Sequence, residues 1–127
     1  MKLLLDTHTF LWFIDDSPLL SAKGKALLEA DNDLLLSIGS LWEIAIKVCL
    51  GKLTVAMPMD VLMTQQLTSN DIDVLAITVP HLITVSTLPL HHRDPFDRLI
   101  IAQAMVEQMP IVSADPAFDA YPVERLW

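Results

Sequence analysis

Short apolar runs recur along the chain and are separated by segments with helical periodicity. Four of these runs predict strands, at Lys2–Leu5, Leu34–Ser37, Ile72–Ile77 and Pro110–Ser113. A short edge strand is predicted over Val123–Trp127. Because pairs of helices separate the strands, the order predicts a parallel sheet covered by helices. We therefore expect a single three-layer α/β/α domain over residues 1–127, with a central, mostly parallel sheet of four to five strands.

The segments between the strands carry signals for helix ends. Helices are predicted over Thr7–Ile14, from Ser17–Pro18 onward, over Met59–Leu67 and over Val79–Val85. In SLWEIAIKVCLGKL, Ser40 is the predicted N-cap and Glu43 stands three residues later, as in a capping box. Gly51 is the predicted C-cap. This helix is apolar nearly all round, which predicts that it is mostly buried.

The stretch RDPFDRLIIAQA predicts a helix with two carboxylates in its first turn. Asp94 is a good N-cap, and Pro95 fits the first helical position. Asp97 lies near the positive end of the helix dipole. Taken alone, each acid therefore has a sufficient structural explanation.

Composition restricts the possible classes of protein. The chain has 127 residues, 53% of them hydrophobic, and only three glycines, so a packed core is expected rather than disorder. Its apolar runs are too short and too interrupted by charge to span a membrane or form a signal peptide. The single cysteine, Cys49, excludes an intramolecular disulfide and fits a reducing cytoplasm and a core position. The net charge of −8 argues against a simple basic nucleic-acid binder, although not against a nuclease with an acidic metal site.

Four acids fall where strands end or helices begin: Asp6, Glu43, Asp97 and Asp115. Parallel connections bring the carboxyl ends of strands to one edge of the sheet. Four carboxylates in one place repel one another unless a cation holds them. Oxygen ligands favour Mg²⁺ or Mn²⁺, and such an ion supports phosphoryl transfer. The pattern therefore predicts a metal-dependent phosphoryl-transfer site.

Local explanations of these acids remain open. Asp6 can cap the following helix, and Glu43 can pair with the Ser40 backbone or with Lys47. If all the acids are caps, the chain is a purely structural, antitoxin-like module. A histidine metal site is disfavoured, because the adjacent His91 and His92 point in different directions on any regular element.

Two other classes also gather acids at strand ends. A receiver-type signalling domain needs a second acid beside Asp6, an aspartate after the third strand and a lysine after a late strand. The chain has Asp6-Thr7, Ile77-Thr78 and Ser113-Ala114 at these places. A phosphatase with an aspartyl nucleophile usually has a second acid two residues later, where this chain reads Thr-His-Thr. The sequence therefore lacks residues that both classes require, and another Mg-dependent phosphohydrolase remains an alternative.

Four blocks together resemble the PIN-domain ribonucleases, and more narrowly the VapC-type toxins of bacterial toxin–antitoxin pairs. The blocks are LLLDTHTFLWF, SLWEIAIKVCLGKL, LPLHHRDPFDRLIIAQA and VSADPAF, and the resemblance extends from Lys2 to about Tyr121. It implies that Asp6, Glu43, Asp97 and Asp115 form the acidic metal site, with Asp94 as a second-tier candidate. It further implies that Thr7 and Ser113 are hydroxyl positions near the metal. Endoribonuclease activity, Mg²⁺ or Mn²⁺, a homodimer and inhibition by a cognate antitoxin are also implied.

Contacts to substrate and partners are less sharply defined. Lys47, Arg93 and Arg98 lie beside the acids and are candidates to meet RNA phosphates. Alternatively, Lys47 pairs with Glu43 and Arg98 is solvated. The aromatic residues Trp12, Phe13 and Trp42 are either core or apolar surface for a homodimer and an antitoxin groove.

Overall fold

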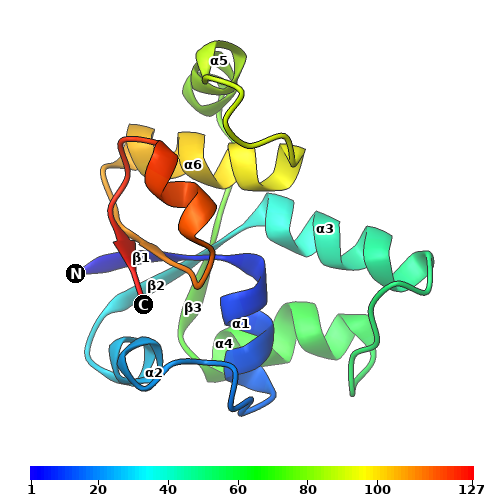
Figure 1. The fold of residues 1–127 in the computed structure, drawn as a ribbon. Helices are drawn as coiled ribbons and strands as arrows, with labels where there is room; N and C mark the ends of the chain where they lie inside the picture. Colours follow the sequence, from blue (N-terminus) through cyan, green and yellow to red (C-terminus); the bar gives the residue numbers. More distant parts are fainter.

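Five parallel strands form one sheet in the order β3-β2-β1-β4-β5 (Figure 1). They are β1 (Lys2–Leu5), β2 (Asp33–Ser37), β3 (Ile72–Leu75), β4 (Ile111–Val112) and β5 (Arg125–Leu126). The computed structural model describes all 127 residues. The predicted α/β fold class is confirmed, with a fully parallel sheet and the short edge strand near the C-terminus.

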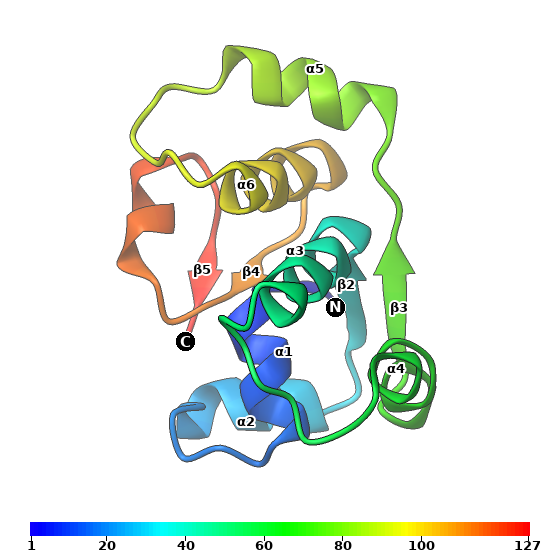
Figure 2. The same cartoon turned by 90° about the vertical axis from the view of Figure 1, so that its right-hand side faces the viewer.

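Helices cover both faces of the sheet, as the alternation of leucines in β1 requires. Leu3 and Leu5 join one core cluster, whereas Leu4 joins the other. The helices are α1 (Thr7–Ile14), α2 (Ala22–Glu29), α3 (Ile38–Cys49), α4 (Leu67–Ser69), α5 (Val79–Thr87) and α6 (Pro95–Glu107), with a π-helix η1 (Val61–Gln66) and a 3-10 helix η2 (Pro116–Ala120). Figures 1 and 2 show α5 beyond α6 as seen from the sheet, and α1, α2 and α4 on the other side.

The order in which the strands are added to the sheet changes direction between β1 and β4. From β1 it builds β2 and β3 on one side, and it then crosses to β4 on the other side. Leu5 pairs with Val112, so the carboxyl ends of β1 and β4 lie next to each other. In open α/β sheets such a switch point leaves a crevice where ligands bind. Asp6 and Ser113, which follow these two strands, therefore lie at the natural position of a site.

The start of α3 differs from the prediction. The helix begins at Ile38, and its cap is Ser37, whose Oγ accepts the Gly39 N–H at 3.1 Å. The predicted capping box at Ser40 is therefore wrong, because β2 leads directly into the helix. Gly39 permits the close approach of α3 to α6, since a Cβ there would lie 2.5 Å from Leu99 Cδ2.

The far side of α3 is exposed, contrary to the prediction that this helix is mostly buried. Trp42 and Leu50 are each 61% exposed, and Cys49 is exposed rather than in the core. The helix packs against α1, α6 and β2, and these contacts bury only one stripe of its apolar surface. Gly51 has φ +71°, the left-handed conformation expected just past a helix end.

Three further boundaries shift by a few residues. The helix predicted from Ser17–Pro18 begins at Ala22, because Ser21 Oγ accepts the Gly24 N–H at 2.9 Å. The predicted Met59–Leu67 helix is η1 followed by α4, and β3 ends at Leu75. None of the helices is long and apolar enough to cross a membrane.

Candidate acidic metal site

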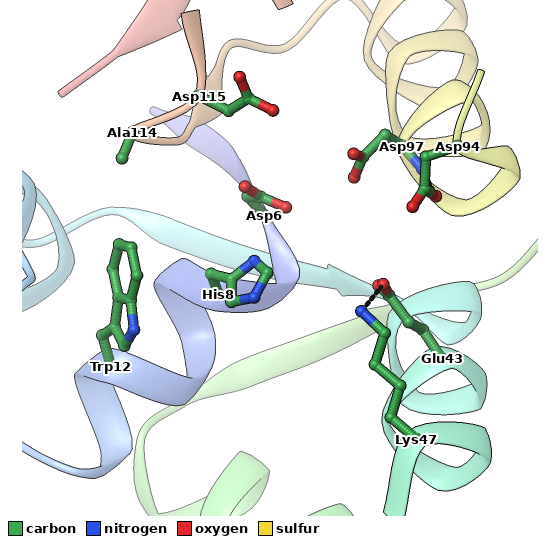
Figure 3. Close-up of a pocket in the computed structure, with 9 residues that line it drawn as sticks. All are labelled: Asp6, His8, Trp12, Glu43, Lys47, Asp94, Asp97, Ala114 and Asp115. Atoms are coloured by element: carbon green, nitrogen blue, oxygen red, sulfur yellow. Dashed lines mark hydrogen bonds and ion pairs between the residues drawn. The ribbon is translucent and has the colours of Figure 1, made fainter. Parts of the chain in front are cut away.

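A polar cavity of about 220 Å³ opens at the switch point (Figure 3). It is lined by Asp6, His8, Trp12, Glu43, Lys47, Asp94, Asp97, Ala114 and Asp115. The four acids singled out in the sequence thus line one cavity, although they come from four different parts of the chain. Asp94 and Lys47 line it as well.

Asp6 follows β1 and is 6% exposed. It occupies the N-cap position of α1, but its side chain makes no cap hydrogen bond. Instead, the Ser113 hydroxyl donates to Asp6 Oδ2 at 2.8 Å and accepts the Asp115 N–H at 3.0 Å. The capping explanation of Asp6 is therefore excluded, and its carboxylate faces the cavity.

Glu43 lies on the buried side of α3, where two groups hold its two oxygens. The Thr7 hydroxyl donates to Oε1 at 2.8 Å, and Lys47 Nζ donates to Oε2 at 2.8 Å. Thr7 Oγ1 is also 2.9 Å from Ser40 Oγ. Thr7 and Ser113 thus both bind carboxylates within the protein. The pairing of Lys47 with Glu43, one of the two alternatives read from the sequence, is the one observed.

Two of the remaining acids combine a local role with a place on the cavity wall. Asp94 caps α6, because its Oδ1 accepts the N–H groups of Phe96 and Asp97. Asp115 caps η2 by accepting the Ala117 N–H at 2.9 Å. Asp97, in the first turn of α6, makes no such cap.

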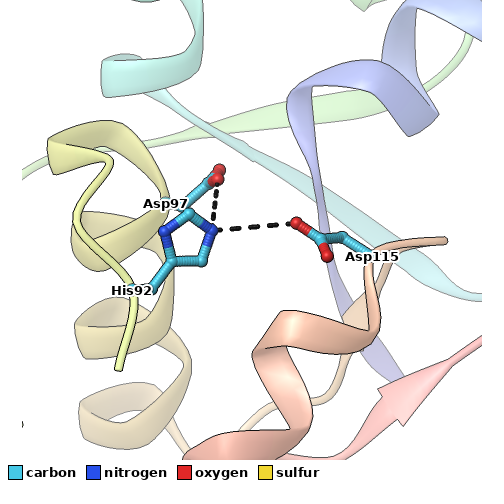
Figure 4. Close-up of side chains that lie close together, drawn as sticks. All are labelled: His92, Asp97 and Asp115. Atoms are coloured by element: carbon cyan, nitrogen blue, oxygen red, sulfur yellow. Dashed lines mark ion pairs between the residues drawn. The ribbon is translucent and has the colours of Figure 1, made fainter. Parts of the chain in front are cut away.

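His92, which sequence reasoning did not select, completes the tightest cluster (Figure 4). Its Nε2 lies 2.9 Å from Asp97 Oδ2 and 3.7 Å from Asp115 Oδ2. Asp6 and Glu43 line the same cavity but fall outside this group. No periodicity marks a residue in the connector between α5 and α6. The only sequence signal for His92 was its position two residues before the Asp94 N-cap.

Burial, together with the negative charges nearby, raises the pKa of two acids in the cavity. The pKa of Asp97 is raised to about 8, first by burial and then by the negative charges around it. Those charges belong to Asp6, Asp94, Glu43 and Asp115. Burial also raises the pKa of Asp6, although the hydrogen bond from Ser113 lowers it. This is the response expected of carboxylates that share a site without a cation.

The donor set fits a hard divalent cation. Five carboxylates line one cavity, and the only lysine or arginine that lines it is Lys47, already bound to Glu43. Mg²⁺ and Mn²⁺ prefer such oxygen ligands, and either would neutralise the acids that now raise the pKa of Asp97. Asp6, Glu43, Asp97 and Asp115 are the residues that would hold it.

The chain matches the PIN domain family over residues 3–124. It belongs to that family. The predicted resemblance to PIN-domain proteins is thereby confirmed. Comparison with curated protein sequences finds no match.

Solved structures with the PIN fold resemble this chain over nearly its whole length. VapBC2 from Rickettsia felis bound to a DNA fragment from their promoter gives a TM-score of 0.74 at 16% identity, covering 99% of this chain and 98% of that chain. FitAcB from Neisseria gonorrhoeae gives 0.68 at 20% identity, with coverage of 98% and 96%. VapBC-1 from nontypeable Haemophilus influenzae gives 0.68 at 16% identity, with coverage of 99% and 97%. These likenesses show the fold.

The three basic residues near the acids of this PIN domain differ in their exposure and in their hydrogen bonds. Arg93 is exposed. The hydrogen bond to Glu43 raises the pKa of Lys47. Arg98 has a structural role that the sequence did not indicate. Its Nη1 and Nη2 donate to four backbone carbonyls, those of Val85, Leu88, Pro89 and His92. Only its Nε–H remains for an RNA phosphate.

The raised pKa of Asp97 predicts that stability falls with increasing pH. The unfolded chain releases this proton near pH 4, whereas the folded protein keeps it to about pH 8. The resulting stabilisation is complete below pH 4 and is lost as pH rises through 8. In EDTA, the free energy of unfolding should be lower at pH 7.5 than at pH 5.5 by about 1–2 kcal/mol. Urea unfolding at both pH values measures this difference in the free energy of unfolding.

Asp97→Asn is the matched variant, because it removes the titrating group and keeps the size of the side chain. We expect it to flatten the pH slope in EDTA, and Mg²⁺ to flatten the slope of the wild type by binding the ionised acids. An equal slope in both proteins, with no effect of Mg²⁺, would show that the acids do not act as a cluster.

Arg98→Lys should destabilise the protein although it preserves the charge. A lysine ammonium cannot bridge four carbonyls as the planar guanidinium does. With hydrogen bonds from a charged group worth roughly 1.5–3 kcal/mol each, a net loss of about 2 kcal/mol is expected. Thermal unfolding tests this, with Arg93→Lys as the exposed control. Equal melting temperatures for the two variants would argue against the structural role.

Proposed function

We propose that this PIN-domain protein is a metal-dependent endoribonuclease that hydrolyses RNA phosphodiester bonds. The observation that carries the proposal is the convergence of Asp6, Glu43, Asp97 and Asp115 on one cavity at the switch point of the sheet. Family membership supports a hydrolase of the nuclease class. The receiver-type and phosphatase alternatives have no comparable support.

The proposed role of each residue follows from its contacts. The four carboxylates would hold Mg²⁺ or Mn²⁺, with Asp94 as a further candidate on the cavity wall. A bound ion would polarise the scissile phosphodiester and lower the pKa of an attacking water. Thr7, Lys47 and Ser113 orient the acids through their hydrogen bonds to Glu43 and Asp6. The contact of Lys47 with an RNA phosphate stays a prediction. Arg93 is the exposed cation nearest in sequence to the Asp94 cap and is the candidate for a phosphate contact.

We further propose that the protein is the toxin of a toxin–antitoxin pair and acts in the cytoplasm. The sequence blocks resemble VapC-type toxins, whose partners are cognate antitoxins, and the structures that the chain resembles include VapBC2 and VapBC-1. A free cysteine without an intramolecular partner suits a reducing compartment.

An apolar surface beside the cavity supports binding to a protein partner. A hollow of about 240 Å³ between α3, α5 and α6 is lined by Trp42, Ile77, Leu82, Val85, Pro95, Phe96 and Leu99. Trp42 also borders a second apolar hollow along α3 that reaches Cys49 and Leu50. Of the three aromatic residues predicted to supply such a surface, only Trp42 is strongly exposed. Trp12 packs near Trp127, and Phe13 packs on the core.

Cleavage of RNA should require both a divalent ion and the acidic cluster. Purified protein should cut single-stranded RNA in Mg²⁺ or Mn²⁺, and EDTA should abolish the activity. Asp97→Asn and Glu43→Gln should each lower the rate by at least about 100-fold, because the metal loses a ligand. A gel assay with mapped cut sites measures this, and DNA and duplex RNA of the same sequence test substrate class.

Asp60→Asn is the control for this experiment, since it removes an exposed carboxylate outside the cavity. It should cleave like the wild type, and circular dichroism should be native for all three variants. Activity that survives EDTA, or that is undiminished in Asp97→Asn, would contradict the assignment.

The apolar surface should mediate association into a homodimer. Light scattering at micromolar concentration should give about twice 14.2 kDa for the wild type. Trp42→Glu should shift the protein towards the monomer, because a buried interface would then contain an unpaired charge. Leu19→Glu is the control, since Leu19 is 65% exposed and lines neither hollow. A 14.2 kDa species for the wild type would count against the homodimer.

A further inference from the structure

His92 projects from the connector between α5 and α6 into the acid cluster (Figure 4). Its side chain is 16% exposed, and its Nε2 lies between the carboxylates of Asp97 and Asp115. The neighbouring His91 points elsewhere and packs edge-on against the ring of Tyr121, with 5.3 Å between ring centroids. Of the two adjacent histidines, only His92 contacts the acids.

The backbone around His92 is held independently of any ligand. Its N–H donates to the Tyr121 hydroxyl at 2.8 Å, and that hydroxyl donates to the Pro89 carbonyl at 2.7 Å. The carbonyl of His92 accepts from Arg98 Nη1 at 3.2 Å. The imidazole ring also lies beside Phe118, at 6.1 Å between centroids. The ring is therefore positioned before a metal ion arrives.

The hydrogen bonds of the imidazole ring indicate whether Nε2 of His92 is a hydrogen-bond donor or a metal ligand. The Asp94 N–H donates to His92 Nδ1 at 3.2 Å, so Nδ1 carries the lone pair. In a neutral imidazole the other nitrogen then carries the proton, and Nε2–H donates to Asp97 Oδ2. To ligate a metal through Nε2, the ring would have to place its proton on Nδ1, facing the Asp94 N–H. This arrangement favours donation to the carboxylate over ligation.

We propose that His92 is a positioning residue that orients Asp97 for the metal ion. By holding Oδ2, it leaves Oδ1 of Asp97 for the ion and limits rotation of the carboxylate. Hydrogen bonds of this kind to ligating carboxylates typically change metal affinity by about 10–100-fold. The inference rests on the proposed function, because it assumes that the acidic cavity binds a divalent cation.

Titration with Mn²⁺, followed by the loss of the free-ion electron paramagnetic resonance signal, tests the inference without any RNA. We compare the wild type with His92→Ala, His92→Gln and His91→Ala. His92→Ala should weaken Mn²⁺ binding about 10–100-fold. His92→Gln should recover most of the affinity, because its amide N–H can donate to Asp97 from a similar distance. His91→Ala should bind like the wild type.

The possible outcomes separate the two proposals. If the wild type binds no Mn²⁺, the proposed metal-dependent function fails, and the inference fails with it. If the wild type binds Mn²⁺ but His92→Ala binds equally or more tightly, only the inference is overturned. It is also overturned if His92→Gln is as weak as His92→Ala, which would mark His92 as a ligand. Should His92→Ala fail to fold, the comparison of His92→Gln with the wild type decides.

Discussion

Mutual repulsion of the carboxylates between β1 and β4 is the constraint on which the rest of the site depends. Hydrogen-bonding partners hold them: Ser113 binds Asp6, Thr7 and Lys47 bind Glu43, and His92 binds Asp97. Only Lys47 among these partners brings a permanent positive charge. The protein therefore fixes the geometry of the cluster with hydrogen bonds and leaves its charge uncompensated, as the raised pKa of Asp97 records. A site of this kind is organised to receive a cation.

Much of the fold could be predicted because each strand and helix is indicated by the residues of its own segment. Runs such as Leu3–Leu5 are apolar throughout, as strands buried on both faces must be, and the helices between them imply parallel connections. Once the strands are parallel, an acid that follows a strand must lie at the carboxyl edge. Asp6 and Asp115 could therefore be placed near each other without knowledge of any side-chain contact.

The errors arose where tertiary contacts decide. Ser40 and Glu43 have capping-box spacing, yet Ser37 caps the helix, because β2 ends there and Gly39 must approach Leu99. Arg98 looked like a solvated or RNA-binding cation, but it binds the Val85 carbonyl of α5 and three carbonyls of the connector that follows, which sequence periodicity cannot position. His92 belongs to the same connector. Its contact with Asp97 depends on how Arg98 and Tyr121 fold that segment back.

A net charge of −8 raises the question of how this protein would approach a polyanion. Of the three basic residues near the acids only Arg93 is exposed, since Lys47 is bound to Glu43 and Arg98 to backbone carbonyls. A divalent ion in the proposed site would reduce the negative charge of the cavity and give a phosphate something to bind. The same ion would thus relieve the repulsion among the acids and permit the substrate to approach. Under the proposed function, binding of the metal ion would thus favour the approach of RNA, and an extensive basic surface would be unnecessary.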